Sequence, residues 1–179
     1  GWELVMKVDG SKSTFDYESE YWTNNEGFND DANDDFDLND DREYKNGKMF
    51  SEAPVSEILL GFKEKSGQNV QYIRLDLGQT FPSLMDLFKS HGNNFVPPGS
   101  DLGSRADWKA WIGPDASLHY DCNKIAINNN QIGPWGHHYD RVRLGIASGN
   151  FYYYNDDCPY IVSRIGVGGG TGRPWWRAN

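Results

Sequence analysis

The stretch Asn150-Phe-Tyr-Tyr-Tyr-Asn-Asp-Asp-Cys-Pro159, followed by Ser163-Arg-Ile-Gly-Val-Gly-Gly-Gly170 and Pro174-Trp-Trp176, is the most informative part of this chain. It sets four aromatic rings directly before three oxygen-rich side chains and a cysteine. Rings beside carboxylates suit a sugar, which stacks on the rings while its hydroxyls meet carboxylates or a bound calcium ion. Alternatively, the tyrosines alternate along a strand and Asn155-Asp156-Asp157 forms a turn.

Length and composition describe a small, loop-rich module. The 179 residues suit one domain spanning 1–179, and 15% aromatic residues with 20 glycines are typical of an extracellular module rather than a helical enzyme. No run of eighteen apolar residues occurs, so no membrane span is expected.

The two cysteines, Cys122 and Cys158, both lie among polar residues, which suits a single disulfide in a secreted protein. Such a bridge would close a loop of roughly 35 residues and stabilise the fold by about 3 to 4 kcal/mol. Two free thiols in a reducing compartment are the alternative. A zinc site is disfavoured because neither cysteine belongs to a C-x-x-C pair. The sequence therefore predicts a secreted, extracellular protein.

The net charge of −9 is concentrated in one acidic run. Seven aspartates lie within twelve positions, and without them the balance would be −2: Asp30, Asp31, Asp34, Asp35, Asp37, Asp40 and Asp41. Nucleic-acid binding is not expected, because it requires a basic surface. The run does not fit an EF-hand, since Phe36 and Arg42 replace the required Gly and Glu. A looser calcium site that includes Asp35 and Asp37 is one interpretation, and a hydrated acidic loop is the other.

The local pattern predicts strands and two short helices. Alternation predicts a strand over 2–8. Two strand-like runs, 55–62 and 70–77, are separated by a turn sequence, and their spacing predicts an antiparallel hairpin. Pro82 and the Ser104-x-x-Asp107 capping box begin the two helices, which end near Gly92 and Gly113. Further strands are expected over 118–120, 125–127, 141–146 and 161–167.

The sequence contains no recognisable catalytic motif. It has no Gly-x-Ser-x-Gly elbow, phosphate-binding loop or dinucleotide fingerprint, so no enzymatic activity is expected. A glycosidase would need two suitably spaced carboxylates, which the sequence cannot reveal. His137 and His138 are adjacent and would point to opposite faces of a strand, which disfavours a shared zinc ion. His138 is kept as a candidate ligand contact.

Two segments resemble fibrinogen-like domains. The first thirty residues resemble the N-terminal part of a fibrinogen-like domain. The resemblance rests on Gly1-Trp2, Asp9-Gly10-Ser11, Phe15, Tyr21-Trp22 and Gly27-Phe28. The later segment carries Asn155-Asp156-Asp157-Cys158, Gly168-Gly169-Gly170 and Trp175-Trp176, and Ser163–Gly170 also resembles a glycine-rich segment of intelectins. Fibrinogen-like domains usually have two disulfides, whereas this chain has cysteines for one.

The resemblance implies a calcium-dependent recognition module. It places Asn155, Asp156 and Asp157 at the ion, and Tyr153, Tyr154, Trp175 or Trp176 in the wall of a ligand pocket. The expected fold is α+β, a mainly antiparallel twisted sheet with two short helices and long loops. The expected function is binding of glycans or glycoproteins, by a homo-oligomer or as part of a larger chain. A cell-adhesion or matrix module without sugar specificity is the main alternative.

Overall fold

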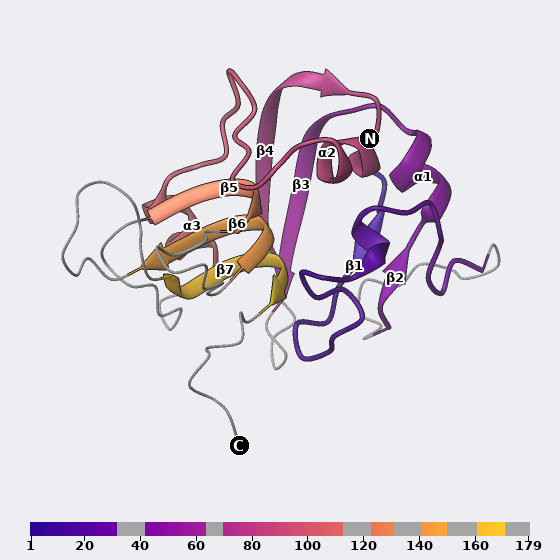
Figure 1. Cartoon of the computed structure of the whole chain (residues 1–179), viewed down its shortest axis with the longest axis horizontal. Coiled ribbons are helices and arrows are strands. Elements are labelled where there is room, and N and C mark those ends of the chain that lie inside the picture. Colours follow the sequence, from indigo (N-terminus) through magenta and orange to yellow (C-terminus); the bar gives the residue numbers. More distant parts are fainter. Residues whose placement is uncertain (32–41, 64–69, 113–122, 131–140, 150–160, 171–179) are drawn as a thin grey trace. The chain divides into compact units, whose positions relative to one another are not determined.

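The computed structural model describes residues 1–31, 42–63, 70–112, 123–130, 141–149 and 161–170 (Figure 1). The chain divides into two compact units. The first comprises Gly1–His91 and Pro97–Asp101, and the second comprises Gly92–Val96 and Leu102–Asn179. No helix in the described ranges is long and apolar enough to span a membrane.

The first unit combines two small antiparallel sheets with short helices. Its elements are β1 (Met6–Lys7), a 3-10 turn (Glu20–Trp22), β2 (Tyr44–Lys45), α1 (Gly47–Glu52), β3 (Val55–Lys63), β4 (Val70–Phe81) and α2 (Leu84–Lys89). β1 pairs with β2, and β3 pairs with β4 as a long hairpin (Figure 1).

The hairpin of β3 and β4 has one buried face and one exposed face. On β4, Ile73, Leu75 and Leu77 are at most 1% exposed, while the residues between them are exposed. The register pairs Ile58 with Leu75 and Leu60 with Ile73, so these apolar residues of both strands lie on one side of the hairpin.

Aromatic rings fill much of the core of the first unit. The buried Trp22 ring meets the Phe88 ring edge-on, with 5.0 Å between centroids, and Phe50 stacks parallel to Phe88. The residues that carry the fibrinogen-like resemblance belong to this packing: Phe15 is 1% exposed, and its ring lies 5.6 Å from that of Phe28. Their contacts are therefore structural.

The second unit contains α3 (Arg105–Ile112) and a three-stranded antiparallel sheet of β5 (Asn123–Asn129), β6 (Arg141–Gly149) and β7 (Ile161–Gly170), in the order β5-β6-β7. The segment before α3 covers the outer edge of β5 through two backbone hydrogen bonds between Phe95 and Ile127, at 2.8 and 2.9 Å.

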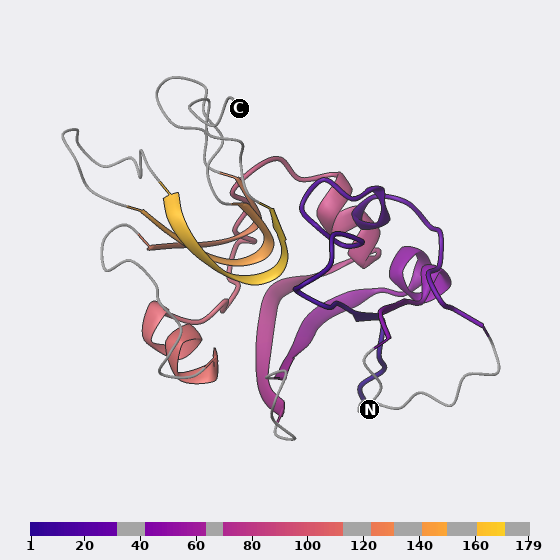
Figure 2. The ribbon, with the colours of Figure 1, turned by 90° about the horizontal axis from the view of Figure 1, so that it is seen from below.

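This three-stranded sheet is strongly curled, as Figure 2 shows. Three small residues lie side by side across the three strands: Ala126, Gly145 and Gly166. A Cβ at Gly166, where φ is +150°, would overlap the carbonyl oxygen of Leu144. The buried Asn129 amide then bridges the curl, donating from Nδ2 to the carbonyls of Lys124 at 2.7 Å and Gly145 at 3.1 Å. Glycines permit the bend, and Asn129 stabilises it.

The predicted class is confirmed: the structure is mixed α+β, with mostly antiparallel strands in small sheets. The described residues form three short helices, where two were predicted, because α1 was missed. The strand predicted over 2–8 is limited to Met6–Lys7, since β2 offers only two residues to pair with it. The expected strand over 118–120 lies outside the described residues.

The start predicted for α3 is confirmed by its cap, whereas α2 begins at Leu84 with Ser83 as its cap, so Pro82 precedes the helix and does not lie in its first turn. Ser83 Oγ accepts a hydrogen bond from the Asp86 amide at 3.0 Å and donates to its carboxylate at 2.8 Å. Ser104 and Asp107 form the reciprocal capping box, in which Asp107 Oδ2 accepts from both the amide and the hydroxyl of Ser104.

Candidate functional site

All the site residues predicted from the sequence lie outside the described ranges. They are the ligand candidates Tyr153, Tyr154, Trp175, Trp176 and His138, the metal candidates Asn155, Asp156, Asp157, Asp35 and Asp37, and the cysteines Cys122 and Cys158. These assignments therefore stay predictions. The structure does describe the strands and turns from which their segments depart.

One end of the curled sheet carries the segment before the second cysteine. Gly149 at the end of β6 pairs with Ile161 at the start of β7, so both ends of segment 150–160 belong to this end. Asn123 at the start of β5 pairs with Ser148 of β6 at the same end. Cys122 directly precedes Asn123 in the sequence. The register thus brings to one sheet end the strand termini that flank both cysteines.

The opposite end of the sheet holds the strand termini from which the segments with the other predicted ligand residues begin. Arg141 at the start of β6 pairs with Gly170 at the end of β7, and Asn129 pairs with Val142. Segment 131–140, with His138, and segment 171–179, with the two tryptophans, both begin here. The nine residues of β6 would span about 26 Å if fully extended. The sequence-based grouping of these residues with Tyr153 and Tyr154 therefore joins segments that leave the sheet at opposite ends.

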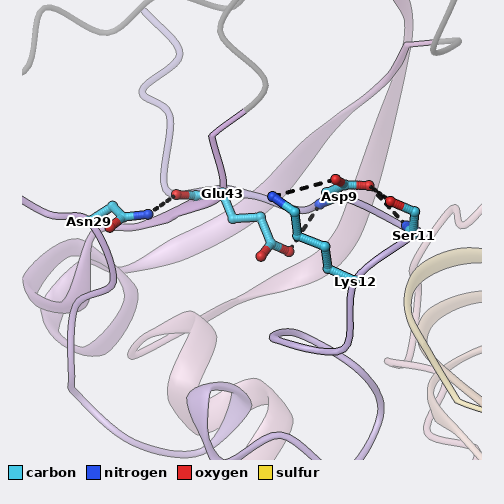
Figure 3. Close-up of polar contacts among 5 residues, drawn as sticks. All are labelled: Asp9, Ser11, Lys12, Asn29 and Glu43. Atoms are coloured by element: carbon cyan, nitrogen blue, oxygen red, sulfur yellow. Dashed lines mark hydrogen bonds and ion pairs between the residues drawn. The ribbon is translucent and has the colours of Figure 1, made fainter.

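The acidic run is held at both of its ends by a closed stem. Phe28 and Lys45 exchange two backbone hydrogen bonds of 2.9 Å, and Asn29 Nδ2 donates to the Glu43 carbonyl at 2.8 Å (Figure 3). The chain leaves this stem after Asp31 and returns at Arg42. Five of the seven aspartates lie between those two residues.

The Asp9-Gly10-Ser11 motif braces the same stem. The Asp9 amide donates to the buried Glu43 carboxylate at 3.2 Å (Figure 3). Asp9 Oδ1 accepts from the Ser11 hydroxyl at 2.7 Å and from the Ser11 amide at 2.9 Å, and Lys12 Nζ lies 3.6 Å from Oδ2. The Ser11 bonds hold the pKa of Asp9 below its ordinary value. The Asp9 carboxylate therefore stabilises the turn, and its hydrogen bonds account for its position without a bound ligand.

Asp30, the first residue of the acidic run, also has a structural partner. Its Oδ2 accepts a hydrogen bond of 3.0 Å from the Gly47 amide at the start of α1. Among the described residues, no three His, Cys, Asp or Glu side chains are grouped closely enough to hold a metal ion.

One further feature was missed by the sequence reasoning. A hollow of about 400 Å³ in the first unit is lined by Gly1, Trp2, Glu57 and Arg74. Trp2 was assigned to a half-buried strand but is 53% exposed. The alternation of polar residues along 70–77 signalled the exposed face of the hairpin, but no local signal linked that face to Trp2, which is more than fifty residues away in the sequence.

No family model matches this chain, and neither does any curated protein or solved structure.

Proposed function

We propose that this chain is an extracellular recognition module that binds glycans or glycoproteins with the help of calcium, and that its fold is a divergent fibrinogen-like one. The observation that carries this proposal is the strand register of the second unit, which gathers at one sheet end the termini flanking Cys122 and both ends of segment 150–160. That segment contains the aromatic and carboxylate residues that suit a sugar and an ion.

The register is compatible with a disulfide between Cys122 and Cys158. β5 and β7 are separated by β6, so their backbones lie about 10 Å apart. The three residues from Cys158 to Ile161 can span about 10 Å, which is long enough for the two Cα atoms to come within the reach of a disulfide, about 4.4 to 6.8 Å. The bridge would hold segment 150–160 against the sheet end and suits a secreted protein.

The closed stem supports a role for the acidic run in cation binding. Five carboxylates confined to the ten positions between Ala32 and Asp41 repel one another, and a divalent cation would relieve that repulsion. Asp35 and Asp37 are the proposed ligands there.

A protein-binding adhesion module is the second candidate. It is favoured by the exposed aromatic side chains Trp2 and Tyr72, which are 53% and 51% exposed. It predicts stabilisation by calcium without competition by sugars.

The test is calorimetric titration of calcium into the chelator-stripped full chain, with the melting temperature followed in parallel. We expect stoichiometric binding and a stabilisation of about 2.7 kcal/mol at a hundredfold excess over Kd. Asp156→Ala with Asp157→Ala should abolish the event at one site, and Asp35→Ala with Asp37→Ala at the other. Glu52→Ala, which removes an exposed carboxylate from α1, is the control.

A glycan array, run with calcium and with chelator, then separates the two candidate functions. Calcium-dependent glycan binding supports the lectin-like function. Calcium binding with an empty array favours the adhesion module, and the absence of any calcium-dependent heat or shift refutes the calcium part of the proposal. Peptide mapping without reduction would show whether Cys122 is joined to Cys158.

A further inference from the structure

The exposed face of the β3–β4 hairpin carries a polar row beside exposed aromatic rings. Tyr72, Arg74 and Asp76 alternate outward along β4, and the register places Glu57 opposite Asp76. Directly opposed residues of antiparallel strands share a face, so Glu57 belongs to the same surface. The Tyr72 ring lies against Gly61 of β3, where an added Cβ would come within 3.1 Å of it.

Trp2 lies at the border of this surface, and its side chain is largely exposed to solvent. It lines the hollow of about 400 Å³ together with Glu57 and Arg74. In the described part of the chain, three large apolar side chains are strongly exposed: Trp2, Tyr72 and Val96. Trp2 lines the hollow with Arg74, and Tyr72 lies two residues from Arg74 on the same face. An indole in this position adds little to the core and offers a flat apolar platform to a ligand.

Arg74 and Glu57 form a direct ion pair at the hollow, joined through Nη2 and Oε1. The side chain of Arg74 is 64% exposed and that of Glu57 is 31% exposed. Each group fixes the other, while the guanidinium keeps further N–H donors and the carboxylate keeps further lone pairs for a ligand. The hollow therefore presents a donor and an acceptor side by side, next to an aromatic ring.

We propose that this hollow, formed by Trp2, Glu57 and Arg74, is a second binding site, which takes a neutral hexopyranose without calcium. A sugar hydroxyl both donates and accepts, so it can accept from Arg74 and donate to Glu57 without breaking their ion pair. An anionic ligand would be repelled by Glu57 and a cationic ligand by Arg74, whereas a neutral sugar meets neither repulsion. The apolar face of the pyranose ring covers the Trp2 indole, and the volume lies within the range of small-ligand pockets, roughly 300 to 1,000 Å³.

This site is independent of the proposed calcium site. It uses residues of the first unit only and none from segments 32–41 or 150–160. Two weak sites in one chain, each with a Kd near a millimolar, would together favour branched or repeated glycans through avidity.

The test is saturation-transfer NMR on the full chain with excess chelator, using methyl α-mannopyranoside, methyl β-galactopyranoside and methyl β-N-acetylglucosaminide as probes. We expect transfer to at least one glycoside, with a Kd of about 1 to 10 mM. Trp2→Ala should weaken binding tenfold or more, whereas Trp2→Phe should retain part of it. Arg74→Ala should weaken it at least fivefold. Val96→Ala is the matched control, since Val96 is equally exposed, lies in the second unit and should leave binding unchanged.

Three results would overturn the proposal: no transfer to any of the three glycosides, binding unchanged in both Trp2→Ala and Arg74→Ala, or tighter binding of methyl glucuronide than of the neutral glycosides. Sedimentation that shows self-association lost in Trp2→Ala would assign the surface to a second copy of the chain instead. The NMR experiment is done without free calcium, so a negative result does not bear on calcium binding by segments 32–41 or 150–160. Conversely, a negative calcium titration does not bear on sugar binding at the hollow.

Discussion

Lys45 provides the sharpest test of the packing of the first unit. It lies on β2 with no exposed surface, and its Nζ donates to the Asn24 carbonyl at 2.8 Å and to Asn24 Oδ1 at 3.0 Å. The ammonium group lies 4.4 Å from the centroid of the Phe50 ring and 5.5 Å from that of Tyr21. Burial lowers the pKa of Lys45 from 10.5 to about 8, and the charge of Glu26 only partly opposes this.

The lowered pKa predicts that the free energy of unfolding rises with pH. Below pH 8, Lys45 is protonated in both states and the native state bears the cost of the buried charge. Between pH 8 and 10.5 the unfolded chain keeps the proton and the native chain loses it, so stability increases with pH. From pH 7.5 to 9.5 the gain due to Lys45 is about 2 kcal/mol. Burial raises the pKa of Tyr44, which opposes this trend only near and above pH 10.

The assay is urea unfolding at pH 7.5, 8.5 and 9.5 of the wild type, Lys45→Met and Lys48→Met. Lys48 is an exposed lysine in α1 and serves as the control. The difference in unfolding free energy between wild type and Lys45→Met should change by about 2 kcal/mol across this range, while that for Lys48→Met stays constant. A constant difference for Lys45→Met would refute the placement of its ammonium group in the aromatic core.

Three substitutions test the remaining structure by urea unfolding. Asn129→Asp should lower the free energy of unfolding by about 3 kcal/mol or more, since it replaces two buried N–H donors by a carboxylate that faces two carbonyls. Wild-type stability of this variant would contradict the hydrogen bonds of Asn129 across the curled sheet. Gly166→Ala should cost about 3 kcal/mol, because its positive φ and the Leu144 carbonyl leave no room for a Cβ; a cost below about 0.5 kcal/mol would contradict the curl. Ser83→Ala should lower the free energy of unfolding by about 1 kcal/mol as a lost helix cap, and wild-type stability would contradict the Ser83–Asp86 capping geometry.

Much of the local structure was readable from the sequence. The hairpin of β3 and β4 followed from two apolar runs separated by a turn sequence, and the start of α3 followed from the Ser104–Asp107 box. Helix α1 was missed because it has only six residues and begins with glycine, while its cap Asn46 reads equally well as a turn residue. Helix caps and strand periodicity depend on residues that are close together in the sequence, so they can be predicted from it.

The candidate sites were less readable, because they depend on which strands pair. The sequence determined that aromatic rings and carboxylates lie together in 150–157, and that the acidity is confined to 30–41. Only the tertiary structure decided that 150–160 and 171–179 depart from opposite ends of one sheet, and that a hollow joins Trp2 to Arg74. It also decided that the charged residue Lys45 is buried against aromatic rings. Register and burial arise from contacts between residues far apart in the chain, and no local pattern specifies them.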